Sequence, residues 1–545
     1  MRAPRLKDLV GAAALLASAL AGAALAVAVE RGVASTPTPA RSPRGSSRHG
    51  AESPDRADAT QRARGERAGG GGELRVDRER SGRSSQSDPL LGASPAAVPH
   101  DVRWIAAGGG PTPEYNQLSV EDDLALFADT LGADRGLLLF AGGPGTRSVQ
   151  VLDTGPRGDD LARGVGDFFD ARDGRDAHYR ATRLALNGPA TISATLGAIE
   201  TALHSGEGPL TVFLAGHGTA GEAPGDAELL MWGDESLTPA VLAATLDHAP
   251  ADRTVRVIIT SCYSGGFGEI AYRGARPDLG LAEADRCGFF AAPWDLEAAG
   301  CDPDPNRAVH EGYAVYFLAA LRGQDRRGHD ALALLDLDHD GHVSLLEAHA
   351  RAVIASTSLD VPTTTSETWL RAAAPEHGAA KPFASLETDA VVSAMALRTG
   401  LVGREARARI ELARMHETMA QLAGDLGAID EDEARAYRAA SAALLSRWPV
   451  LDDPWHPDFD ATLASEHDAV SAFFDGAPEM LAWRDARARI DALEQRLDDA
   501  RVDAAPYERL VRALDDRALS ARLHAQGGTA WHRYERLLAC ERGTL

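Results

Sequence analysis

Short apolar runs alternate with helical patterns through the first half of the globular part of this chain, and this alternation most constrains its fold. Parallel strands need a long crossover connection, usually a helix, so the alternation favours a mostly parallel sheet with flanking helices. We therefore predict an α/β fold that begins near Val98. The predicted strands are 102–107, 137–141, 211–216, 255–261 and 287–292, and the predicted helices are 120–131, 190–204, 239–248 and 308–321.

Beyond about Leu386 the pattern changes to helices alone. Two apolar stripes there have spacings of three and four residues, which places each stripe on one helix face and predicts a coiled-coil-like hairpin or small bundle. Packing of the helices on each other explains the stripes, and binding of a partner or self-association is the alternative. The stripes are Leu412, Met415, Met419, Leu422 and Leu426, and Trp483, Ala486, Ile490, Leu493 and Leu497.

The N-terminus resembles a targeting segment. Basic residues, among them Arg5 and Lys7, precede an apolar stretch from Leu9 to Val29. Residues 1–29 are therefore expected to form a secretory signal peptide or, if uncleaved, a membrane anchor that tethers the protein. Either role places the body outside the cytoplasm, as a secreted, periplasmic or membrane-anchored protein.

Residues 30–97 consist mainly of Arg, Ser, Gly, Pro and Ala, and they predict a disordered linker. The body that follows divides into an α/β domain over residues 98–385 and an all-α region over residues 386–545. This body is strongly acidic, with 41 basic against 70 acidic side chains. Such a charge repels phosphate backbones, so we expect no nucleic-acid partner.

Two predicted strands run directly into residues that carry chemistry. The strand 211–216 leads into His217 and Gly218, and the strand 255–261 leads into Cys262. Adjacent parallel strands end at the same edge of a sheet, so we expect the imidazole and the thiol side by side. Such a pair can perform nucleophilic acyl transfer, in which His217 takes the proton and the thiolate attacks a carbonyl. The N–H groups of Gly218 and Cys262 would form an oxyanion hole.

The residues around this pair resemble the two motifs of caspase- and legumain-like cysteine peptidases. The motifs are Gly-His-Gly at 216–218 and Ser-Cys-Tyr-Ser-Gly-Gly at 261–266, and the resemblance covers about residues 98–373. It implies a caspase–haemoglobinase-like α/β fold and hydrolysis of peptide bonds in peptide or protein substrates. It also implies a thioester on Cys262, with His217 as general base and acid. Asn116, after the first strand, is the candidate for orienting the imidazole.

Two acidic residues follow the strand that comes after the nucleophile. Asp295 and Glu297 stand where members of the resembled family border the substrate pocket. A carboxylate there would favour an Arg side chain, which pairs well with it. We therefore treat Asp295 and Glu297 as candidate substrate-binding residues.

The chain has four cysteines, and two of them follow the nucleophile strand closely. Cys287 and Cys301 lie 14 residues apart. In an exported protein a disulfide between them is the expected pairing. Cys540 would then be a free thiol or an intermolecular link.

Residues 336–347 match a calcium-binding loop of the EF-hand type. Such a loop needs oxygen ligands at positions 1, 3, 5 and 9, a backbone carbonyl at 7, Gly at 6 and Glu at 12. One unpaired loop favours a structural Ca²⁺ site over a sensor. The residues at these positions are Asp336, Asp338, Asp340, Gly341, His342, Ser344 and Glu347.

Two functions fit these motifs. The first is an exported cysteine-type endopeptidase that calcium stabilises. The second is a catalytically inactive exported calcium-binding interaction module on a peptidase-like fold. An esterase with Ser264 as nucleophile is weaker, because the Gly-x-Ser-x-Gly pattern around the serine is absent.

Overall fold

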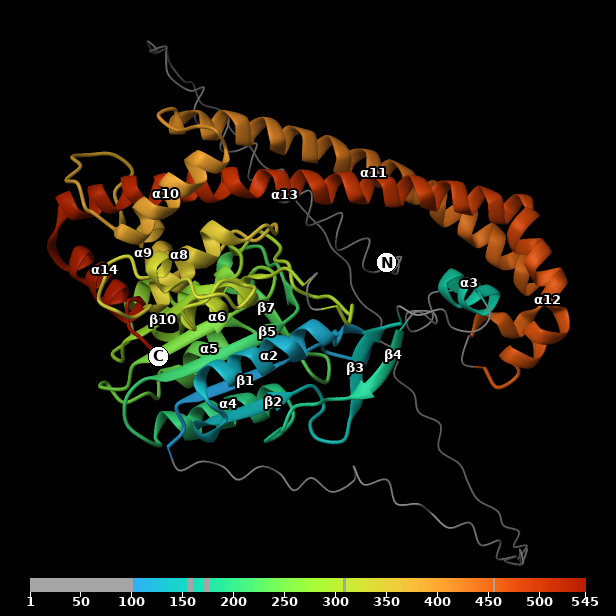
Figure 1. Ribbon diagram of the computed structural model, residues 1–545, viewed down its shortest axis with the longest axis horizontal. Coiled ribbons are helices and arrows are strands. Elements are labelled where there is room, and N and C mark those ends of the chain that lie inside the picture. Colours follow the sequence, from blue (N-terminus) through green and yellow to red (C-terminus); the bar gives the residue numbers. More distant parts are fainter. Residues whose placement is uncertain (1–100, 154–159, 170–176, 307–309, 454–455) are drawn as a thin grey trace, which may run out of the picture. The chain divides into compact units, whose positions relative to one another are not determined.

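A six-stranded sheet lies at the centre of the α/β part of this computed structural model (Figure 1), in the order β11-β10-β9-β5-β1-β2. Five of its strands pair in parallel, and the short edge strand β11 (Thr363–Thr364) runs antiparallel to β10. The predicted α/β fold with a mostly parallel sheet is confirmed. The parallel strands are β1 (Trp104–Gly109), β2 (Gly136–Phe140), β5 (Leu210–Gly216), β9 (Val255–Ile259) and β10 (Arg286–Phe290).

The structure describes residues 101–153, 160–169, 177–306, 310–453 and 456–545. The predicted signal segment 1–29 and the predicted linker 30–97 lie outside these residues. Among the helices of the described ranges, none is long and apolar enough to cross a bilayer.

Helices cover both faces of the sheet. Phe213 of β5 belongs to one buried cluster, whereas its neighbours Val212 and Leu214 belong to another, because successive strand residues point to opposite faces. Strands buried on both faces explain the continuous apolar runs in the sequence. Helices on the Phe213 side are α2 (Leu118–Leu131), α6 (Tyr313–Leu321), α8 (Leu345–Ala355), α9 (Thr365–Ala373) and α14 (Gly528–Glu541), and those on the other side are α4 (Ile192–Leu203) and α5 (Pro239–Leu246).

The α/β part differs from the predicted pattern in several places, among them helices α8 and α9, which were not predicted. The helix predicted over 308–321 begins only at Tyr313, and residues 307–309 lie outside the described ranges. Two small antiparallel sheets were not predicted at all. They consist of β3 (Arg147–Leu152) with β4 (Ala177–Ala181), separated in sequence by α3 (Asp160–Phe169), and of β6 (Gly218–Thr219), β7 (Glu228–Met231) and β8 (Glu235–Leu237).

The C-terminal region is largely helical, as predicted. Its two longest helices, α11 (Ala408–Leu445) and α13 (Pro478–Gln526), pack along each other as an antiparallel hairpin (Figure 1). The predicted stripes meet there, since Leu422 clusters with Leu493 and Leu497. The other helices of this region are α10 (Leu386–Arg398) and α12 (Phe459–Gly476). A short helix of the α/β part, α7 (Leu332–Leu335), directly precedes the acidic loop, residues 336–347.

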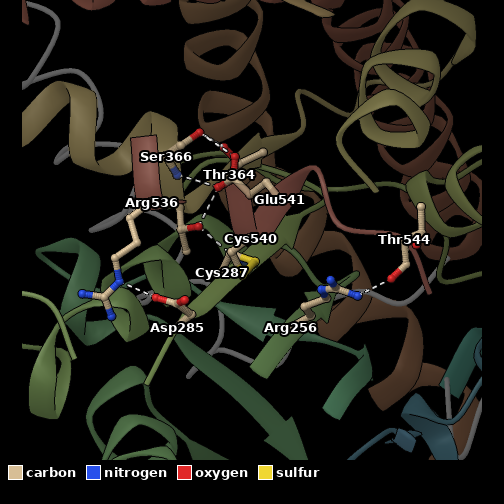
Figure 2. The surroundings of a disulfide bond; sticks show 11 residues. Arg256, Asp285, Cys287, Thr364, Ser366, Arg536, Cys540, Glu541 and Thr544 are labelled. Atoms are coloured by element: carbon tan, nitrogen blue, oxygen red, sulfur yellow. Dashed lines mark hydrogen bonds and ion pairs between the residues drawn. A yellow bond between two sulfur atoms is a disulfide. The ribbon is translucent and has the colours of Figure 1, made fainter. Parts of the chain in front are cut away.

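A disulfide attaches the last helix to the central sheet (Figure 2). Cys287 of β10 is bonded to Cys540 of α14, and Cys262 and Cys301 are free. The predicted Cys287–Cys301 disulfide is therefore wrong. Cys287 is fully buried in β10, against which α14 packs, whereas Cys301 lies in an exposed position of the loop that follows the strand.

Polar contacts reinforce this attachment. The buried carboxylate of Glu541 accepts hydrogen bonds from Thr365 Oγ1 (2.7 Å) and from the N–H and Oγ of Ser366 (2.7 and 2.6 Å). Arg256 of β9 donates to the carbonyl of Thr544 (Figure 2). The end of the chain is thus bound to the strand that leads to Cys262 and to its neighbour.

Candidate active site

His217 and Cys262 follow two neighbouring parallel strands, each at the same distance beyond a paired residue of its strand. Leu214 of β5 pairs with Ile259 of β9, and each candidate residue lies three positions beyond its member of this pair. The register therefore brings the imidazole and the thiol to the carboxyl edge of the sheet together, where open α/β sheets place their ligands. Both residues are half-buried.

Gly218 lies directly against the Cys262 backbone. A Cβ on Gly218 would stand 2.2 Å from the carbonyl oxygen of Cys262, so only glycine fits here. Leu230 donates its N–H to the His217 carbonyl (2.9 Å). His217 and Leu230 are thus a hydrogen-bonded pair of the antiparallel ladder. Such pairs alternate with non-hydrogen-bonded ones, so the next pair, Gly218 and Leu229, is not hydrogen-bonded, and the N–H of Gly218 points away from β7. That N–H is not used by the ladder and can donate to a substrate oxygen.

A buried hydroxyl without a partner lies beside these residues. Ser261 is 1% exposed, and its Oγ has no hydrogen-bond partner in the described part of the chain. The same oxygen would stand 3.0 Å from a Cβ on Gly218. Buried polar atoms are nearly always paired, so an unpaired one at this edge is typical of a site that receives a ligand or an ordered water.

Residues from the loop after β1 hold the imidazole of His217. Its Nε2 lies 2.8 Å from Oε1 of Gln117, and the ring of Tyr115 meets it edge-on with 5.6 Å between centroids. Burial lowers the pKa of His217, while a hydrogen bond with the Tyr115 backbone opposes this shift. The imidazole is therefore neutral at pH 7, which is the form that can accept a proton.

The neighbouring Asn116, which was the candidate for orienting the imidazole, has another role. Its Oδ1 accepts from the Gly110 N–H (3.2 Å), and its Nδ2 donates to the Ser148 carbonyl (3.0 Å). Asn116 thus shapes the loop from inside, and the next residue, Gln117, contacts the imidazole. Gln117 and His217 are 100 positions apart, and no local pattern in the sequence indicates that they meet.

The loop after β10 holds the thiol of Cys262. Its Sγ lies 3.3 Å from the nitrogen and 3.5 Å from the oxygen of Ala298. Burial raises the pKa of Cys262 to about 11, although the hydrogen bond with Ala298 opposes this. The resting thiol is therefore protonated at neutral pH.

Asp360 and helix α13 fix that loop in place. One oxygen of the fully buried Asp360 accepts from the Ala299 N–H (2.6 Å), and burial raises the pKa of Asp360 to about 6. Arg509 of α13 donates to the Asp360 carbonyl (2.7 Å). The helical region thus supports, through two hydrogen bonds in series, the loop that touches the thiol.

The structure also places the other three candidate side chains, and Glu297 is the one whose charge acts on the thiol. Glu297 accepts from Tyr263 Oη (3.3 Å) and forms an ion pair with Arg501 of α13 (3.2 Å). Asp295 is exposed on the same loop. Ser264 is fully buried and its Oγ accepts from the Ala292 N–H (3.4 Å), so it is poorly placed to act as a nucleophile.

The acidic loop brings together the oxygens that a hard cation prefers. Carboxylate oxygens of Asp336, Asp338 and Asp340 lie within 4.8 Å of one another. Gly341, with a φ of 90°, turns the chain and donates its N–H to Asp336 (2.9 Å). This donor set fits Ca²⁺, for which carboxylates are ordinary ligands.

Glu347 closes the same loop. Its oxygens accept from the N–H of Leu337 (2.7 Å) and from the N–H and Oγ of Ser344 (2.8 and 2.9 Å). Ser344 in turn accepts from the Glu347 N–H, which completes a capping box at the start of α8. Glu347 and Ser344 therefore stabilise the helix as well as standing at ligand positions, and His342 contributes its N–H to Asp340 (2.8 Å).

No protein-family model, curated protein or solved structure matches this chain. The likeness of its motifs to caspase- and legumain-like peptidases therefore stays a hypothesis.

Proposed function

We propose that this protein is an exported cysteine-type endopeptidase of the caspase–haemoglobinase-like fold, with Cys262 as nucleophile. One observation carries the proposal: the β5–β9 register brings His217 level with Cys262 at the carboxyl edge of a parallel sheet. The close contact of Gly218 with Cys262 and the unpaired Ser261 hydroxyl support it.

In this proposal the neutral imidazole of His217 takes the Sγ proton while the sulfur attacks the substrate carbonyl carbon. The N–H groups of Gly218 and Cys262 donate to the oxygen that becomes negative. His217 then gives the proton to the leaving amine, and water hydrolyses the thioester with His217 as base. Before this reaction, the thiol must leave its contact with Ala298, and the imidazole must leave its contact with Gln117.

The preferred substrate side chain is proposed to be Arg. Glu297 already binds one guanidinium, that of Arg501, and Asp295 lies exposed two residues away. A substrate Arg would compete with Arg501 for the same carboxylate. Paired carboxylates and guanidiniums form the bidentate contacts that make such recognition selective.

Calcium is proposed to bind in the acidic loop, on Asp336, Asp338 and Asp340. Without a cation these carboxylates repel one another, and a bound cation removes that repulsion. Because the loop leads into α8, which packs against α6 beside the sheet, its role would be structural.

Export is proposed from the N-terminal segment, which would also tether the protein to a membrane if it stayed uncleaved. The Cys287–Cys540 disulfide supports export, since such bonds persist mainly in oxidising compartments.

The resting contacts favour one second candidate, a catalytically inactive calcium-binding interaction module. The thiol is bonded to Ala298 with a raised pKa, and Nε2 of His217 is bonded to Gln117. In such a module these contacts would be permanent.

One experiment separates the two functions. The full chain is incubated with a peptide library and, separately, with an iodoacetamide probe, and Cys301→Ala serves as the matched control because Cys301 is the other free thiol. We expect Cys262→Ala and His217→Ala to abolish hydrolysis while Cys301→Ala keeps it. The peptidase proposal would be rejected if Cys262→Ala hydrolysed peptides at the wild-type rate. It would also be rejected if the folded wild type hydrolysed no peptide under any condition.

A further inference from the structure

The corner between α10 and α11 contains a hollow of about 430 Å³, which is unrelated to the residues around Cys262. Its walls come from the end of α10, the turn that follows and the first turns of α11, with Tyr507 of α13 behind them. Three of the lining side chains are arginines, Arg404, Arg407 and Arg414.

This hollow is positively charged although the chain is strongly acidic. Residues 398–414 contain five Arg and two Glu, whereas the whole chain has 56 basic and 80 acidic side chains. Among the lining residues, Glu411 is the one carboxylate, and it is shared by Arg407 (3.4 Å) and Arg414 (2.9 Å). Arg404 donates to the Gly400 carbonyl (3.1 Å). The lining thus has an excess of two positive charges.

Exposed large apolar side chains lie next in sequence to residues that line the hollow. Leu397 is 74% exposed, Val402 64% and Ile410 56%, and these are three of the four most exposed large apolar residues in the described ranges. A single exposed apolar residue is ordinary, but three between residues 397 and 410 indicate an interaction surface. Val402 is presented by a tight turn in which Gly400 and Gly403 have φ angles of 69° and 71°, a conformation that glycine favours.

We propose that this corner, residues 397–414, docks on the surface of an anionic phospholipid bilayer. The arginines would bind lipid phosphates, which guanidinium groups pair with well, and Leu397, Val402 and Ile410 would enter the boundary between headgroups and acyl chains. A bilayer would accommodate both the charged and the exposed apolar side chains, whereas an acidic peptide would pair with the charges and leave the apolar side chains in water. The proposal is independent of the peptidase proposal and of whether the N-terminal segment is cleaved.

The test measures the environment of the turn at residue 402. Insertion of residues 9–29 into vesicles would therefore not by itself give the same signal. An environment-sensitive dye is attached to Val402→Cys in the full chain carrying Cys262→Ala and Cys301→Ala, which removes the two other free thiols. We expect a blue shift on titration with phosphatidylglycerol vesicles, none with phosphatidylcholine vesicles, and reversal by salt, which screens the charges.

Arginine variants then test whether the blue shift depends on the arginines that line the hollow. Arg404→Gln with Arg407→Gln should weaken the phosphatidylglycerol titration about 30-fold. The matched control, Arg435→Gln with Arg438→Gln, changes two exposed arginines farther along α11 and should titrate as the parent does. No blue shift, or a shift that Arg404→Gln with Arg407→Gln leaves unchanged, overturns the proposal. So does saturation by a poly-glutamate peptide without any response to vesicles, which would assign the corner to an acidic protein partner.

Discussion

Gly218 and Cys262 meet backbone to backbone, at a distance that leaves no room for a Cβ on the glycine. The contact joins the turn after β5 to the turn after β9, so the residue proposed to donate to the oxyanion packs against the residue proposed as nucleophile. A change at Gly218 should therefore act on chemistry and on local packing together.

Gly218→Ala should lower kcat about 10²- to 10³-fold, because the new Cβ forces the backbone away from Cys262 and misplaces the N–H of residue 218, with an effect like that of losing one oxyanion-hole donor. It should also reduce the free energy of unfolding by about 1–3 kcal/mol, because the new methyl group overlaps a backbone carbonyl. Peptide hydrolysis and urea unfolding measure the two effects. Gly197→Ala is the control, since a Cβ there meets nothing within 4 Å in α4. Wild-type kcat in Gly218→Ala would contradict the assignment.

The alkylation rate of Cys262 should keep rising with pH until about 11, the value to which burial raises its pKa. Only the thiolate reacts, so the rate follows the deprotonated fraction, which is small at neutral pH and grows as pH approaches the pKa. Mass spectrometry of iodoacetamide-treated Cys301→Ala, which has one free thiol, gives this profile. A plateau reached near neutral pH would instead indicate a thiolate–imidazolium pair.

Arg501→Ala should improve the KM for substrates with Arg before the scissile bond by about two- to fivefold and leave kcat unchanged. The change releases Glu297 from its ion pair with α13, so the carboxylate becomes available to the substrate. Glu297→Gln should raise the same KM. Arg496→Ala, another exposed arginine on α13, is the control. Equal KM values in all four proteins would exclude Glu297 from substrate binding.

Calcium should raise the melting temperature of the full chain, because a ligand that binds only the folded state adds about 2.7 kcal/mol at a hundredfold excess over Kd. Asp338→Asn with Asp340→Asn should remove this effect. These two exposed residues are better choices than Glu347, whose carboxylate also caps α8. Glu222→Gln with Asp252→Asn makes the same charge change at exposed positions elsewhere. A wild-type melt that EGTA and calcium both leave unmoved would contradict the site.

Cys540→Ser should lower the free energy of unfolding by about 2–5 kcal/mol, because the bond to Cys287 closes a very long loop and restricts the unfolded chain. Urea unfolding measures the loss. Cys301→Ser, which removes a free thiol, should leave the midpoint close to that of the wild type. Similar midpoints for Cys540→Ser and the wild type would mean that the disulfide does not form in solution.

The sequence predicts the central sheet well because its strands are buried on both faces and so consist of continuous apolar residues. The positions of His217 and Cys262 follow from where β5 and β9 end. The β6–β8 sheet was missed because its strands are short and carry half-buried Glu228 and Glu235, which interrupt any apolar pattern.

Contacts between distant parts of the chain could not be predicted in this way. Gln117 lies 100 residues from His217, and Cys540 lies 253 residues from Cys287. Neither pairing leaves a periodic or spacing signal, and cysteine connectivity in particular does not follow from sequence alone. The Cys287–Cys301 prediction failed for this reason, since it used nearness in sequence where packing of α14 on β10 decides.

The attachment of residues 540–544 to the central sheet and to α8 also sets an order of events during biosynthesis. β10 is synthesised long before Cys540, and α8, whose Leu345 N–H donates to the Gly543 carbonyl (3.1 Å), also precedes its partner. During synthesis from the N-terminus, the strands of the sheet are therefore made first, and the disulfide can form only after Cys540 has been synthesised. Until Cys540 has been synthesised, the Cys287 thiol therefore lacks its disulfide partner.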